Sequence, residues 1–265
     1  MINHAIDQVF SSQWWVLLSV SALLLAIAEL GFRFGMRLYR ANDEARKSQI
    51  AGVQGATLGL LGLLLAFTFS MSTQRYETRR QQVLNEANAI GGTYLRVTLL
   101  PESRQARVRD LLRRYVDVRL DFRRAGEDEA KQFEAERAGA ALQRELWTHA
   151  TEAAKGGSTP LAAIFITSLN EMIDLDRARY YSLRDHVPGA VWLLVLFVAS
   201  VGCFASGYGS GSTGARNRFV NITLPLLIGV VITLIADLDR PRGGLIGVSQ
   251  QPMLDLKVIL SRDQP

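Results

Sequence analysis

The apolar residues of this sequence gather in a few long blocks, and the block from Ala56 to Met71 contains no charged residue. With the small residues before it, this block approaches the roughly 17 to 25 residues that a helix needs to cross a bilayer. Three further blocks have the same character: Trp14–Leu30, Val187–Ala205 and Phe219–Leu238. A content of 48% hydrophobic residues would also fit a large soluble domain, so it is their distribution that predicts a membrane protein with four spanning helices.

The region between the second and third blocks, Ser72–His186, is rich in Arg, Glu, Ala and Gln. No proline occurs from Gln74 to Leu100, and apolar residues recur there at helical spacing. We therefore predict that the second spanning helix continues out of the membrane as far as the break at Pro101. Further helices are expected on both sides of a bend at Gly126, and another helix is expected to start at Pro160.

These observations predict an all-α membrane protein in four parts. Residues 1–73 hold the first two spanning helices, and 74–186 form an extramembrane helical domain that is continuous with the second. Residues 187–239 hold the last two spans, which we expect to be joined by a flexible glycine-rich turn at 207–214, and 240–265 form a tail that packs near the membrane. Four spans put both termini and the middle region on one side. Basic residues near the spans number seven on one side of the membrane and eight on the other. The positive-inside rule therefore does not decide which side is the cytoplasm.

The second helix has two contrasting faces when it is wound at 3.6 residues per turn. One face is expected to let a neighbouring backbone come close, because it carries only small residues: Gly52, Gly55, Gly59, Gly62, Ala66 and Ser70. The roughly opposite face would suit a narrow apolar pore with a basic mouth at Arg75 and Arg79, and it carries Thr57, Leu61, Leu64 and Thr68, with Leu65 and Phe69 beside them. Alternatively, each threonine hydroxyl simply bonds the carbonyl four residues earlier.

The sequence contains no motif of a known catalytic class. It has no glycine-rich phosphate loop, no HExxH motif and no cysteine or serine in a recognisable nucleophile context. Its three histidines lack metal-ligand spacing, and its single cysteine lies in an apolar block. We expect no enzyme activity, no metal and no cofactor. The pI of about 9.6 does not indicate nucleic acid as a partner, because basic residues beside membrane helices set topology and contact lipids.

Two aspartates close the fourth apolar block. Asp237 lies at the edge of the apolar run, where an unpaired charge would be costly, and Asp239 follows one residue later. Such a carboxylate pair could bind a cation or could lock helix ends together. We expect structural ion pairs at the membrane edge that involve Asp237, Asp239, Arg240 and Arg242. The tail beyond them is expected to pack under the membrane helices, with both arginines near lipid phosphates and a short helix starting near Pro252.

Several motifs of this chain resemble a known family. They are Gly-Leu-Leu-Gly-Leu-Leu-Leu-Ala-Phe-Thr-Phe-Ser at 59–70, Asn-Glu-Ala-Asn-Ala-Ile-Gly at 85–91, Thr-Tyr-Leu-Arg at 93–96, Tyr-Val-Asp at 115–117 and the tail from 238 to 256. Together they resemble the bacterial bestrophin-like domain family, a group of membrane proteins, over nearly the whole length of the chain.

The resemblance implies properties that the residues alone do not establish. Bestrophins proper are homopentameric anion channels with a cytosolic helical domain and a neck of apolar residues one turn apart on the second helix. The similar positions here are Leu61, Leu65 and Phe69. Animal bestrophins also carry an acidic run after the last span that binds calcium, but residues 237–242 of this chain have no net charge, so calcium gating is not carried over.

Two functions are compatible with the sequence. The first is a homo-oligomeric, pentameric channel of the bacterial inner membrane, with the middle region and termini in the cytoplasm, that conducts an anion such as chloride. The second is a non-conducting scaffold or motor-stator-like complex that acts through its projecting helices. Proton-driven machines usually need an acid or a hydroxyl inside the membrane that faces a partner helix. Thr57 and Thr68 could serve, but no carboxylate lies at mid-span. That absence favours the channel.

Overall fold

The computed structural model describes residues 13–37, 44–126, 128–155, 160–214, 218–241 and 245–262. Within these ranges every regular element is a helix. The contacts between residues divide the chain into two compact units. The first comprises the chain up to Arg75 together with His186–Arg240 and residues 245–246, and the second comprises Tyr76–Asp185 together with Pro241 and the tail from Gly247.

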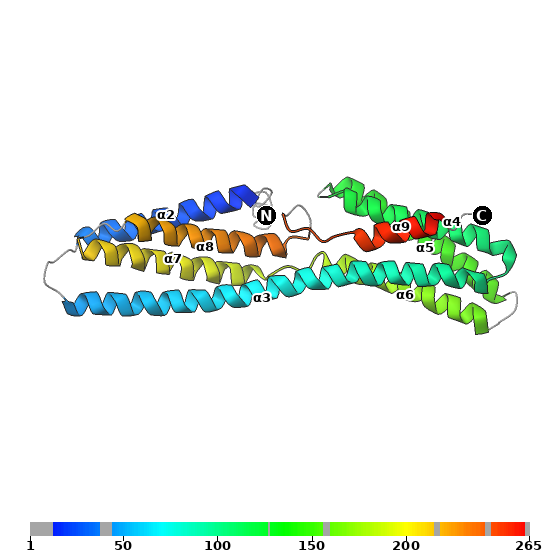
Figure 1. Ribbon diagram of the computed structural model, residues 1–265, viewed down its shortest axis with the longest axis horizontal. Coiled ribbons are helices and arrows are strands. Elements are labelled where there is room, and N and C mark those ends of the chain that lie inside the picture. The colour runs from blue at the N-terminus through cyan, green and yellow to red at the C-terminus, as the bar shows by residue number, and fades with distance from the viewer. Residues whose placement is uncertain are drawn as a thin grey trace. The chain divides into compact units, whose positions relative to one another are not determined.

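The first unit is a bundle of long apolar helices. It consists of α2 (Gln13–Arg37), the first part of α3 (Glu44–Arg96), α7 (Gly189–Ser212) and α8 (Arg218–Asp239) (Figure 1). All four are long and apolar enough to cross a bilayer. The four spanning helices expected from the sequence are therefore present, and each is longer than its apolar block.

The most closely packed contact of this unit joins α2 to α7. A Cβ atom built on Gly207 would lie 1.9 Å from the carbonyl oxygen of Ala28, and one built on Gly31 would lie 2.2 Å from that of Phe204. Only glycine permits this approach of two backbones. The flexible turn expected at 207–214 is wrong over most of its length, because α7 continues to Ser212 and uses these glycines to pack against α2.

The core of the first unit draws side chains from all four helices. Leu24 and Ala28 of α2 are buried with Val195, Ala199 and Cys203 of α7, with Ile228 and Ile232 of α8, and with Leu61 of α3. Further along α7, a Cβ atom built on Gly202 would lie 3.2 Å from the side chain of Leu58. One side of α3 thus packs against α7 within the same chain.

The second unit is an antiparallel arrangement of amphipathic helices around the second part of α3. After a short 3-10 turn at Val97–Leu99 it contains α4 (Glu102–Arg124), α5 (Glu129–Lys155), α6 (Pro160–Ser182) and α9 (Gln251–Arg262). Figure 1 shows α4, α5, α6 and α9 gathered along this part of α3.

The helix boundaries of this unit follow the signals that the sequence offers. Pro101 precedes α4 and α6 starts at Pro160. Gly126, just beyond α4, has a φ of +57°, a left-handed conformation that glycine adopts without strain. The predicted break at Pro101, the bend at Gly126 and the start at Pro160 are confirmed.

The tail helix α9 is part of the core of the second unit. Met253, Leu256 and Leu260 are buried among apolar side chains of α3 and α4. Nε of Arg113 donates to the Leu260 carbonyl at 3.0 Å, and Lys257 pairs with Asp117 at 2.6 Å. The short helix near Pro252 is confirmed. Its apolar side pairs with the extramembrane helices, which the sequence analysis did not foresee.

Candidate functional site

The membrane part of α3 is the spanning segment that its own chain covers least. Only 6% of its most apolar 18-residue stretch is buried, against 33% for each of the other three spans. Cβ atoms built on four of its glycines would meet no atom within 4 Å: Gly52, Gly55, Gly59 and Gly62. The small-residue face of α3 is thus open among the described residues of a single chain.

The opposite face of α3, which the sequence analysis assigned to a pore, turns toward the chain's own helices. Leu61 is 2% exposed and Thr68 is 1% exposed. Side chains enclosed in this way do not reach an axis shared between copies, so we correct the pore-lining prediction for these two residues. Leu64 and Leu65 are half-buried against the same core.

The remaining predicted pore residues have mixed positions. Phe69 is exposed, and Thr57 is half-buried beside Gly202. The Thr57 hydroxyl donates to the Val53 carbonyl at 2.8 Å, and the Thr68 hydroxyl donates to the Leu64 carbonyl at 2.7 Å. Each threonine hydroxyl thus bonds the carbonyl four residues earlier, which is the alternative to a pore-lining role for the two threonines. A pore-lining role for Thr57, Leu64, Leu65 and Phe69 stays a prediction.

Arg79 does not form a basic mouth, because it is buried inside the second unit. Its Nε donates to the Ser182 carbonyl at 3.1 Å, and its Nη2 donates to the Asp185 carbonyl at 2.7 Å. These carbonyls lie at and just beyond the carboxyl end of α6, where a helix favours a cation. Arg79 therefore ties α3 to the end of α6. Arg75 is half-buried and stays a candidate for the mouth.

The two aspartates at the end of α8 are buried and bind backbone amides. The Asp237 carboxylate accepts from the nitrogens of Leu245 and Ile246 at 3.0 and 2.9 Å. Both oxygens of Asp239 accept from the nitrogen of Val187, at 3.0 and 3.1 Å. Asp237 thus fixes the start of the tail, and Asp239 fixes the segment that enters α7.

This geometry changes the expected role of the aspartates. The sequence predicts ion pairs with the neighbouring arginines, and in the structure the carboxylate oxygens accept from main-chain N–H groups, which helps to satisfy a buried charge. Asp239 also lies 3.7 Å from Nδ1 of His186, and ion pairs with the arginines stay a prediction. Arg240 is half-buried, and Arg242 lies outside the described residues. Within the described part of the chain, no cluster of three His, Cys, Asp or Glu residues has metal-binding geometry.

A buried charge network, which the sequence analysis missed, joins three helices of the second unit. Glu86 of α3 is completely buried between Arg119 of α4 and Arg179 of α6. Nε of Arg119 lies 2.5 Å from one Glu86 oxygen, and Arg179 bonds the other. The second guanidinium arm of Arg119 pairs with Asp176 at 2.6 Å.

The opposite charges of this network favour the ionised form of each other. Burial alone would raise the pKa of Glu86, but the two guanidinium groups outweigh burial and hold this pKa below its ordinary value. Burial would lower the pKa of Arg119, but Glu86 and its other neighbours raise it. Glu86 and Arg119 both sit among apolar residues at helical spacing, and a charged residue on such a stripe was the signal available in the sequence.

Comparisons with known proteins agree with this architecture. A bestrophin-like domain model matches residues 14–253. No curated protein sequence matches the chain. Two solved structures, each a single-residue variant of a bacterial bestrophin homologue from Klebsiella pneumoniae, resemble the fold with TM-scores of 0.62 and 0.59 at 16% and 14% identity. The two matches cover 94% and 92% of this chain, and 96% and 98% of the respective homologue chains.

Sequence and fold therefore lead to one assignment. The family model spans most of the chain, and the four spanning helices and the extramembrane bundle have the fold of the solved homologues. Family and fold support a channel-like role in a membrane. The chain belongs to the bestrophin-like family.

Proposed function

We propose that this chain forms a homo-oligomeric, pentameric channel of the bacterial inner membrane that conducts small anions such as chloride, with α3 of each copy beside the pore. The observation that supports this most is the open glycine face of α3, which no other described part of the chain covers. The subunit number and the anion preference rest on the resemblance to bestrophins. Lipids and further copies of the chain are the other expected partners.

The exposure of α3 suggests which residues narrow the pore. At 100° per residue, Leu63 and Phe67 lie on the same side of the helix as Gly59 and Ser70. Leu63 is 52% exposed and Phe67 is 61% exposed. Large apolar side chains that follow open glycines would form a hydrophobic constriction, which can gate a pore by dewetting. We therefore move the proposed constriction from Leu61 and Thr68 to Leu63 and Phe67.

Anion flux from liposomes tests this constriction. Shortening Leu63→Ala or Phe67→Ala should increase chloride flux several-fold, because each change removes part of an apolar barrier on the pore axis. Leu193→Ala is the matched control, since Leu193 is 72% exposed on α7 and should leave flux unchanged. Equal flux in wild type, both α3 variants and the control would contradict the constriction.

The scaffold remains the second candidate, because α3 runs without interruption for 53 residues from the membrane part into the extramembrane bundle. Such a helix could transmit force or position a partner. An intact oligomer that passes no ion through liposomes, in wild type and in Leu63→Ala alike, would favour this function over the channel.

We further place the second unit and both termini in the cytoplasm, as in bestrophins. The basic residues of the sequence do not decide the side, so the proposal needs a direct readout. A reporter enzyme active only outside the cytoplasm, fused after Pro265, should be inactive in cells. An active reporter would reverse the orientation.

A further inference from the structure

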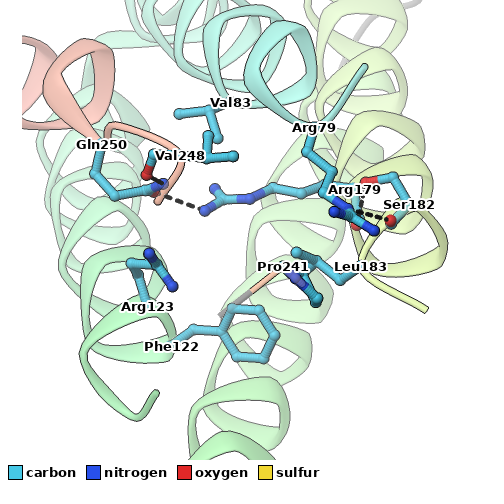
Figure 2. A pocket seen from close by; sticks show the side chains of 10 residues that line it. All are labelled: Arg79, Val83, Phe122, Arg123, Arg179, Ser182, Leu183, Pro241, Val248 and Gln250. Carbon is cyan, nitrogen blue, oxygen red and sulfur yellow. Dashed lines mark hydrogen bonds between the residues drawn. The ribbon is translucent and has the colours of Figure 1, made fainter. Parts of the chain in front are cut away.

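The second unit contains a small cavity whose walls carry three arginines. Arg79 of α3, Arg123 of α4 and Arg179 of α6 line it, together with Gln250 of the tail (Figure 2). Its volume is about 20 Å³, which is space for one water-sized particle. None of these residues belongs to the membrane part of α3, so the cavity is distinct from the proposed pore.

Two of the three arginines, Arg79 and Arg179, donate hydrogen bonds to other groups of the chain. Arg79 binds the two carbonyls at the end of α6. Arg179 binds Glu86 and also donates from Nη2 to Oε1 of Gln250 at 2.7 Å. Figure 2 shows Arg179 and Gln250 joined across the cavity. These bonds hold two guanidinium groups in fixed positions at its wall.

Arg123 differs from the other two. Its side chain is half-buried, and no hydrogen bond or ion pair joins it to any residue in the described ranges. Its Nη2 lies against the tail, 3.2 Å from a Cβ atom built on Gly247. Burial and the nearby charge of Arg179 both lower the pKa of Arg123. A partly buried cation beside another cation is stabilised by an anionic partner, and among the described residues no carboxylate pairs with Arg123.

We propose that this cavity binds one small inorganic anion of the size of chloride, with Arg123 and Arg179 as its principal cationic partners. The volume is close to that of a monatomic ion, whereas a tetrahedral oxyanion would need the walls to move much further. The cavity is built from α3, α4, α6 and the tail segment that carries Pro241, Val248 and Gln250. The bound anion would therefore fasten the tail to the extramembrane bundle. This site is independent of whether the chain conducts ions.

Thermal unfolding of the purified full-length protein tests the site. Sodium chloride is compared with sodium gluconate at equal ionic strength, because gluconate is too large for the cavity. A ligand that binds only the folded state raises the Tm, and the stabilisation grows with the logarithm of one plus the ratio of ligand concentration to Kd. For a Kd on the order of 30 mM, raising chloride from near zero to tenfold above this Kd should raise the Tm by about 3 °C.

Two variants connect this effect to the cavity. Arg123→Gln should abolish the chloride-dependent shift. Arg124→Gln should retain it, because Arg124 is exposed and pairs with Asp121 at 2.9 Å instead. A shift that persists in Arg123→Gln would overturn the proposal and assign the anion to another place such as the pore. No shift in wild type, or an equal shift with sodium sulfate, would also overturn it.

Crystals soaked in sodium bromide provide a readout that does not depend on a variant. Bromide resembles chloride in charge and approximate size, and its anomalous scattering locates it directly. A peak between the guanidinium groups of Arg123 and Arg179 would support the site. Bromide peaks elsewhere in the molecule, with none in this cavity, would overturn it.

Discussion

At the scale of single residues, most buried charges of this protein are committed to holding helices and segments together. Glu86 joins α3 to α4 and α6, while Asp237 and Asp239 each bind main-chain amides. In the sequence, Asp237 lies at the edge of an apolar run, where an unpaired charge would be costly. In the structure its side chain is buried. The sequence could not reveal the partners of these groups, because they lie far away in the chain or belong to the backbone. Glu86 lies on an apolar stripe of its helix, which marks it as a candidate for burial but does not identify Arg119 and Arg179 as its partners.

Removing the charge of Glu86 should strongly destabilise the second unit. Glu86→Gln leaves two buried arginines without their carboxylate, and breaking a buried ion pair from one side costs about 3–5 kcal/mol. Glu77→Gln is the matched control, because Glu77 pairs with Arg80 at the surface of the same helix, where such pairs contribute about 0–1 kcal/mol. Denaturant unfolding of both variants measures the difference. Equal losses of stability would contradict the role of the network.

The lowered pKa of Glu86 also predicts a pH dependence. Because the folded-state pKa lies below the ordinary value of 4.5, the stabilisation is fully present above pH 4.5 and is lost as pH falls through the folded-state pKa. The free energy of unfolding of the wild type should therefore decline more steeply below pH 4.5 than that of Glu86→Gln. Parallel pH profiles for the two proteins would show that Glu86 titrates alike in folded and unfolded chains.

At the scale of helices, the sequence predicts where elements begin and end better than which sides they bury. Pro101, Gly126 and Pro160 act locally on the backbone, so their effects can be anticipated. The faces of α3 could not be assigned, because in a membrane both the covered and the open side are apolar and no polar contrast separates them. The glycine-rich pattern at 207–214 predicts a turn, but α7 continues to Ser212, and Gly207 and Gly211 form its contact with α2.

The contact between α2 and α7 should be intolerant of any side chain. Gly207→Ala would place a Cβ atom 1.9 Å from the Ala28 carbonyl oxygen, and the helices would have to separate. Overpacking of this kind typically costs about 1–3 kcal/mol. Gly52→Ala is the control, because a Cβ atom there meets nothing within 4 Å. We expect a lowered Tm in detergent for the first variant and an unchanged or raised Tm for the second. The reverse order would refute the close contact.

At the scale of the whole molecule, the chain combines a membrane bundle with an extramembrane bundle, and α3 contributes to both. The four spans and the long helical region were predictable from the distribution of apolar residues. The assembly of several copies was not, because only the resemblance to bestrophins suggests a subunit number. The open glycine face of α3 is the structural feature that assembly would explain.

The most direct test of this account is an electron-microscopy reconstruction of the purified protein in detergent or nanodiscs. We predict a closed ring, with five copies as in bestrophins, in which Gly59, Leu63 and Phe67 of every α3 face the axis. A monomer would contradict the account, as would a ring whose α3 helices turn the glycine face toward lipid or whose axis is filled by a partner helix.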